Sequence, residues 1–192
     1  MRIIGIDPGT AVTGIGIVEY NNKDFRLIHF DTINLNQKKS IPERLKIIYD
    51  GCLSCIMKYK PDEFAIETAF YGKNIQSTLK LGQARGVAII AALNSNLKIS
   101  EYSPREVKKS VTGNGASSKE QVKYMVNCIL STGKMEIPVD SSDALAIAIC
   151  HTFKLQNGFS NDSGNYRENS WQSFIQKNPE RILKNNVRRK EI

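Results

Sequence analysis

The sequence contains no apolar run of the roughly 18 residues that a membrane-spanning helix needs. Its longest apolar stretch, residues 86–93, is interrupted by Asn94. The N-terminus lacks the basic segment, apolar segment and small-residue cleavage site of a secretory leader. Internal repeats are absent, and the 13 Gly and 6 Pro are scattered, which excludes collagen-like, coiled-coil and wholly disordered chains. We therefore expect a cytoplasmic protein without membrane contact.

A complete set of zinc ligands is missing as well. Cys52 and Cys55 have C-x-x-C spacing, but Cys128 and Cys150 are separated by 21 residues, so the second closely spaced pair of a structural zinc site is absent. The first pair falls on an apolar stripe with helical spacing between residues 45 and 59. Buried free cysteine packs like a small hydrophobic residue. We expect this pair in the core and leave open whether any of the four cysteines has a function.

The length and charge of the chain narrow its class further. The 192 residues suffice for one domain with a full-sized core. Lysine and arginine number 27 against 19 aspartate and glutamate, which gives a net charge of +8. Such an excess is typical of proteins that meet a polyanion, and nucleic acid is the obvious one. A charge of this size is also compatible with solubility alone.

Hydrophobic periodicity and turn residues predict an α/β fold. The pattern predicts strands at 2–7, 13–19, 26–34, 64–67 and 98–102, and helices at 41–59, 77–93, from 119 and from 140. Short turns join the first three strands as antiparallel hairpins. Helical crossovers add the last two strands, so we expect a mixed sheet of three antiparallel and two parallel strands, flanked by helices. One domain at 1–155 is followed by a polar, basic tail at 156–192 with room for one short helix near 171–175.

Four carboxylates stand in apolar surroundings that do not require them. Asp7 ends the first strand and Glu67 ends the fourth, while Asp140 and Asp143 lie in the first turn of the last helix on one face. If the first and fourth strands are neighbours, Asp7 and Glu67 come within a few ångströms of each other. Taken singly, each residue also has an ordinary explanation as a turn residue, a strand-end charge or a helix cap.

Carboxylates gathered in a half-buried pocket repel one another, and in proteins this repulsion is usually offset by bound divalent cations. Hard oxygen ligands suit Mg²⁺ or Mn²⁺, which complete their coordination with water and phosphate oxygens. Two such ions roughly 3.5–4 Å apart stabilise the attacking and leaving oxygens of a phosphoryl displacement. The set therefore predicts a divalent metal site suited to phosphoryl displacement.

Three segments resemble the RuvC family of Holliday junction resolvases: GIDPGTAVTGIGIV, AIETAFYGKNIQSTLKLGQARGVAI and DSSDALAIAICH. The similarity runs in order over residues 1–155 and ends before the tail. It implies an RNase H-like fold, a homodimer, and metal-dependent endonuclease action that nicks two opposed strands of a four-way DNA junction in recombination and repair, leaving 5′-phosphate and 3′-hydroxyl ends. It also implies Mg²⁺ as cofactor and the RuvA and RuvB proteins as partners. The metal-binding carboxylates of the family fall on Asp7, Glu67, Asp140 and Asp143.

The same resemblance assigns DNA-contacting residues. The aromatic residue that the family places at the junction core falls on Phe70, whose ring could stack on unpaired bases or simply pack in the core. Lys108 and Lys119 match basic residues of the family motifs, within a segment that carries six basic and three acidic residues (98–123). A single lysine can also be an ordinary solvated charge.

Two further features leave alternatives open. Gly82 and Gly86 lie four residues apart on a helix and would allow a close backbone neighbour, either within the protomer or across a dimer. His151 matches the family pattern, but about 12 Å of helix separate it from Asp143, so we do not expect it to bind the same ion.

Three rival functions are compatible with parts of the sequence. An actin-like or sugar-kinase-like ATPase shares the Asp7–Gly14 pattern, although it would need a second domain. A catalytically inactive junction-binding module is disfavoured by the presence of all four carboxylates. An RNase H acting on RNA–DNA hybrids lacks the Glu67–Gly86 resemblance.

Overall fold

The computed structural model describes residues 1–22, 24–68, 74–133 and 135–160, with the backbone alone for 157–160. Phe70 and the tail at 161–192 lie outside the described residues. The elements are β1 (Arg2–Asp7), β2 (Val12–Asn21), β3 (Asp24–Asn34), α1 (Ile41–Tyr59), β4 (Glu63–Glu67), α2 (Ile75–Asn94), β5 (Lys98–Tyr102), α3 (Pro104–Thr112), α4 (Lys119–Leu130) and α5 (Val139–Ser160). Within these residues no helix is long and apolar enough to cross a membrane.

The five strands form one mixed sheet in the order β3-β2-β1-β4-β5. Strands β1, β2 and β3 pair antiparallel, whereas β4 runs parallel to both β1 and β5. The two central strands β1 and β4 are continuous apolar runs because helices cover both of their faces. The predicted mixed sheet, and the adjacency of its first and fourth strands, are confirmed.

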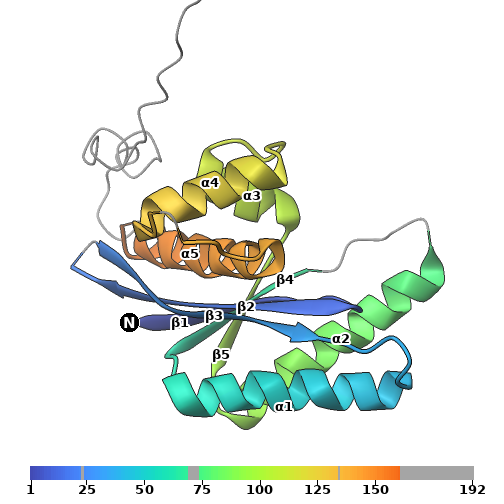
Figure 1. Cartoon of the computed structure of the whole chain (residues 1–192). Coiled ribbons are helices and arrows are strands. Elements are labelled where there is room, and N and C mark those ends of the chain that lie inside the picture. The colour runs from blue at the N-terminus through green and yellow to red at the C-terminus, as the bar shows by residue number, and fades with distance from the viewer. Residues whose placement is uncertain (23, 69–73, 134, 161–192) are drawn as a thin grey trace, which may run out of the picture.

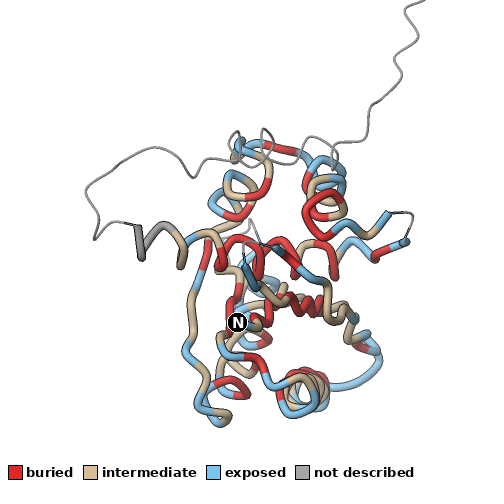
Figure 2. The backbone as a smooth tube through the Cα atoms, turned by 90° about the vertical axis from the view of Figure 1, so that its left-hand side faces the viewer, coloured by how far each residue is buried: buried red, intermediate tan, exposed pale blue. Residues whose placement is uncertain are grey.

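Helices cover the two faces of the sheet unequally. Figure 1 shows α1 and α2 on one face and α3, α4 and α5 on the other. Figure 2 shows that buried residues gather toward the middle of the molecule, while the outer turns and connections are mostly exposed. The sheet therefore separates two hydrophobic cores.

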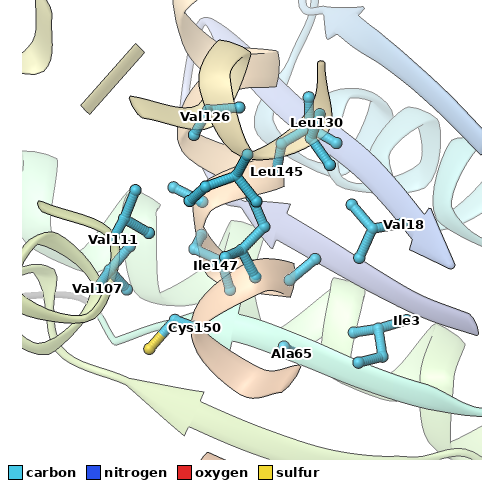
Figure 3. Packing of buried hydrophobic residues seen from close by; sticks show 14 of the residues in the cluster. Ile3, Val18, Ala65, Val107, Val111, Val126, Leu130, Leu145, Ile147 and Cys150 are labelled. Carbon is cyan, nitrogen blue, oxygen red and sulfur yellow. The ribbon is translucent and has the colours of Figure 1, made fainter. Parts of the chain in front are cut away.

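Helix α5 is the centre of one core. Its residues 144–150 are almost fully buried, because the sheet lies below them and α3 and α4 lie above. Figure 3 shows Leu145, Ile147 and Cys150 between Val107 and Val111 of α3, Val126 and Leu130 of α4, and Ile3, Val18 and Ala65 of the sheet. A helix enclosed in this way can hold its first turn in a fixed place over the strand ends.

Helix α3 was not predicted. It begins with Ser103 as N-cap, Pro104 in its first turn and Glu106 completing a capping box, and it ends at Gly113 in the left-handed conformation. These are the same signals that correctly predicted α1 from Ser40. The helix has only nine residues, and its two buried apolar positions, Val107 and Val111, lie one turn apart on a single face.

The other predicted features agree with the structure to within a few residues. Cys52 is fully buried and Cys55 partly buried on the inner side of α1, and neither is bonded to another cysteine. Helix α5 continues past the predicted boundary at 155 to Ser160.

Candidate active site

The ends of β1 and β4 bring two carboxylates together. The parallel register pairs Ile6 with Ile66, so the next residues along each strand, Asp7 and Glu67, lie side by side at the same edge of the sheet. A hydrogen bond from Asp7 lowers the pKa of Glu67, although burial and Asp143 raise it more strongly. The predicted convergence of these two residues is confirmed.

Glycines in β1 and β2 set the distance from the sheet to α5. Gly14 is the register partner of Asp7, and a Cβ built on Gly14 would lie 2.0 Å from the carbonyl oxygen of Asp140. A Cβ on Gly16 would likewise come within 2.5 Å of the Leu145 nitrogen. Only glycine therefore lets the first turns of α5 reach the sheet, and this brings Asp140 and Asp143 to the end of β1.

A side chain also fixes the start of α5. The hydroxyl of Ser141 donates a 2.8 Å hydrogen bond to the carbonyl oxygen of Asp31 in β3. Ser141 is fully buried, so this bond is shielded from water and holds the turn between Asp140 and Asp143 against the sheet.

The electrostatics show that the carboxylates interact. Burial, followed by repulsion from Glu67 and Asp143, raises the pKa of Asp7 to about 8. Burial, followed by repulsion from Asp143, raises the pKa of Glu67 to about 7. Asp140 contributes to the shift of Asp7 in the same direction. A site that opposes its own ionisation in this way is built for positive charge.

Lys119 supplies part of that positive charge. It is the first residue of α4, and its Nζ donates a 2.7 Å hydrogen bond to Oδ2 of Asp143. This bond, together with the charges of Asp143 and Asp7, raises the pKa of the ammonium group. Lys108 of α3 also lowers the pKa of Glu67 through its charge. The helices on one face of the sheet thus bring both predicted lysines toward the carboxylates.

The donor set fits a hard divalent cation. All four predicted ligands are carboxylates, and two of them have raised pKa values that a cation would reverse. Among the described residues, no group of three or more acidic, histidine or cysteine side chains lies close enough together to hold an ion. An ion at this site would require the carboxylates to lie closer together than they do in this structure.

Sequence comparison identifies the family. The family model for crossover junction endodeoxyribonuclease RuvC matches residues 3–151. The chain belongs to the RuvC family. The RuvC proteins of Chloroherpeton thalassium and Salinibacter ruber are 47% and 46% identical, over 96% and 95% of this chain and 100% and 99% of their own lengths. The rival assignment to actin-like or sugar-kinase-like ATPases is therefore wrong.

Solved structures agree with this family and fold. Thermus thermophilus RuvC is 31% identical, with a TM-score of 0.76 over 82% of this chain and 97% of that one. Thermus RuvC in complex with a Holliday junction substrate matches with a TM-score of 0.77. The yeast mitochondrial Holliday junction resolvase Ydc2, 15% identical with a TM-score of 0.58, shares the fold alone. The fold is the RNase H-like one expected for the RuvC family.

A buried network of His151, Tyr102 and Glu63 lies near this RuvC site, and these contacts were not predicted from the sequence. His151, which is 1% exposed, accepts or donates a 2.7 Å hydrogen bond at Nδ1 with the Tyr102 hydroxyl, and its Nε2 lies 3.5 Å from Glu63. The Tyr102 carbonyl in turn accepts a 2.8 Å bond from the backbone of Thr68, directly after Glu67. His151 thus links α5 to the start of β4 and the end of β5.

Proposed function

We propose that this chain is a structure-selective endonuclease that resolves four-way DNA (Holliday) junctions by paired symmetric nicks in recombination and repair. The observation that carries the proposal is the meeting of Asp7, Glu67 and the first turn of α5 at one edge of the sheet. Membership of the RuvC family gives this arrangement its substrate, since the Thermus relative is described with a Holliday junction bound. We also propose a cytoplasmic location, since an enzyme of this kind would have to reach the DNA that it resolves.

Asp7, Glu67, Asp140 and Asp143 would hold Mg²⁺, two ions per site, with Mn²⁺ able to substitute. Bound ions would stabilise charge on the attacking and leaving oxygens of a hydrolysis that leaves 5′-phosphate and 3′-hydroxyl ends. The raised pKa values of Asp7 and Glu67 support this assignment, because a cation replaces the protons that those groups otherwise keep near neutral pH.

The lysines then bind and orient the substrate strand. Lys119 lies against Asp143 with its side chain 60% exposed, so its ammonium can turn toward a phosphate and stabilise charge that develops there. Lys108 contributes a second positive charge from α3. Phe70, which follows Glu67 by three residues, is assigned to stacking on unpaired bases at the junction core.

A symmetric pair of nicks calls for a two-fold enzyme, and α2 offers a surface for it. Exposed apolar residues flank two glycines along one side of this helix, at spacings of three and four residues: Ile75, Leu79, Gly82, Gly86, Ile90 and Leu93. A Cβ at Gly82 or Gly86 would meet no described atom within 4 Å, so these glycines are not needed for packing within the protomer. We assign this stripe to the homodimer, and we assign RuvA and RuvB as partners of the dimer on the junction.

The decisive test is cleavage of labelled four-way junctions, linear duplexes and RNA–DNA hybrids, with and without Mg²⁺. We expect paired nicks in the junction alone and only with the metal. Asp7→Asn and Glu67→Gln should keep junction affinity and lose at least about a hundredfold in rate. Asp50→Asn, an exposed carboxylate paired with Lys46 on α1, is the control and should cleave normally. Equal cleavage of duplex and junction, or activity of both variants within tenfold of wild type, would overturn the proposal.

A further inference from the structure

The connection between β3 and α1 lies directly beside the turn that follows Asp7. The backbone nitrogen of Leu35 donates a 2.8 Å hydrogen bond to Ala11, and the side-chain amide of Gln37 donates a 2.9 Å bond to the carbonyl of Thr10. Figure 1 shows this connection running from the end of β3 to the start of α1. Residues 36–40 therefore stand at the same edge of the sheet as the carboxylates, on the side of α1 rather than α3–α5.

Local hydrogen bonds give this segment a defined shape. The side chain of Asn36 accepts a 2.9 Å bond from the Lys38 nitrogen, and its carbonyl accepts a 3.0 Å bond from the Lys39 nitrogen. Ser40 then begins α1, and its backbone nitrogen donates a 2.8 Å bond to Glu43. The turn holds the backbone of two adjacent lysines in place without using their ammonium groups.

Arg44 lies beneath this turn as a buried charge. It is only 9% exposed, and its Nη1 donates to the carbonyl of Thr10 at 3.1 Å and to Oε1 of Gln37 at 2.8 Å. Both acceptors are neutral, its Nε has no hydrogen-bond partner, and no carboxylate among the described residues forms an ion pair with it. A buried cation without a counter-charge is costly, so its retention beside the Asp7 turn points to an anion supplied from outside the chain.

The local charge balance favours the same anion. The side chains of Lys38 and Lys39 are exposed, and neither ammonium forms an ion pair with a described carboxylate. The one acidic residue of the turn, Glu43, is engaged by the hydroxyl and backbone of Ser40, which lower its pKa. Three cations against one carboxylate leave two positive charges in excess within this turn.

We propose that residues 36–40, with Arg44 beneath them, form a second phosphate-binding platform, which holds the backbone of the DNA strand on the side of the active site opposite Lys108 and Lys119. Lys38 and Lys39 contact phosphates, and Arg44 is a positioning residue that fixes Gln37 and the Thr10 turn and adds its charge. This inference rests on the proposed function, since the anion is the backbone of the junction. A platform here explains why basic residues lie on both sides of the carboxylates, on the α1 side as well as on the side of α3 and α4.

The test compares two double variants that remove the same charge. Lys38→Gln/Lys39→Gln removes the platform lysines. Lys60→Gln/Lys98→Gln removes two exposed lysines, one at the end of α1 just before β4 and one at the start of β5, at the other end of the strands from the carboxylates. Affinity for a fluorescently labelled four-way junction is measured from low to high salt in an Asp7→Asn background, which prevents cleavage. The platform variant should bind about tenfold more weakly and lose about 1–2 units from the slope of log K against log salt. The control should change that slope much less.

Each outcome has a definite meaning. An unchanged slope in Lys38→Gln/Lys39→Gln, or an equal loss in the control, would overturn the platform while leaving junction cleavage by the wild-type chain intact. Failure of the wild-type chain to bind or cleave junctions would instead overturn the proposed function.

Arg44 is tested with two substitutions. Arg44→Lys keeps the charge and Arg44→Gln keeps a donor without it, and a thermal melt sets the temperature at which each variant is fully folded. The platform predicts a reduced salt slope for Arg44→Gln alone. Equal slopes for both folded variants would show that Arg44 acts only in folding.

Discussion

At the scale of single residues, the clustered carboxylates of the site lower the stability of the folded chain. Asp7 is held where burial and three neighbouring carboxylates disfavour its ionised form, and its pKa is raised to about 8. A residue selected for folding alone would be neutral at this position. The cations proposed for this site would offset that cost.

This conflict predicts that Asp7→Asn stabilises the metal-free protein at high pH. An unfolded Asp7 loses its proton near pH 3.8, whereas the folded one loses it near 8, so wild-type stability falls as the pH rises between those values. The neutral asparagine avoids this loss, which a pKa difference of this size sets at up to about 6 kcal/mol above pH 8. Thermal melts in EDTA at pH 5 and pH 9 measure it. A melting-temperature difference that is the same at both pH values would contradict the assignment.

Lys119 should contribute to rate more than to affinity. Its ammonium is bonded to Asp143 inside the carboxylate cluster, where a donor to a developing charge is worth about 10²-fold or more in rate. We expect Lys119→Gln to slow single-turnover cleavage by at least about tenfold, while junction affinity changes by a few fold. Lys109→Gln, an exposed lysine on α3, is the matched control. A loss of affinity that accounts for the whole loss of rate would assign Lys119 to binding alone.

At the scale of elements, the sequence predicted which strands carry the carboxylates but not how they are brought together. Asp7 and Glu67 could be placed at strand ends because apolar runs stop there, and the crossover rule made those strands neighbours. The approach of α5 depends on Gly14 and Gly16 meeting backbone atoms of a helix about 125 residues later in the chain, a contact that no local pattern encodes. Helix α3 escaped prediction because it is only nine residues long, although its capping box and its single buried face, Val107 and Val111, both mark it.

The glycine contact can be tested by adding one methyl group. Gly14→Ala forces the Asp140 end of α5 away from the sheet, and overpacking of this kind costs about 1–3 kcal/mol or more. Gly16→Ala creates a similar clash at Leu145 and is the comparison. Both should lower the melting temperature, but at a temperature where both are folded only Gly14→Ala should lose most of its cleavage. Normal cleavage by folded Gly14→Ala would show that α5 does not need this spacing.

At the scale of the whole molecule, the two faces of the protomer have different tasks. The active-site edge carries carboxylates and basic groups from both helical layers, whereas the outer side of α2 carries exposed apolar residues and two glycines that pack against nothing described in the protomer. A helix with such a stripe is expected to associate, because burying it removes apolar surface from water and the glycines allow close approach.

The α2 stripe therefore predicts that Leu79→Glu separates the dimer. Leu79 is 63% exposed in the protomer, so the substitution costs the monomer little, but it would bury an unpaired charge in a symmetric interface. Sedimentation at micromolar concentration should show dimers for the wild type and monomers for Leu79→Glu. Met57 is 68% exposed on α1, and the control variant Met57→Glu should remain dimeric.

Because paired nicks need two active sites on one junction, the monomer should release singly nicked junctions in place of resolved duplexes. Monomeric Leu79→Glu that still makes paired nicks at the wild-type rate would show that resolution does not require this dimer.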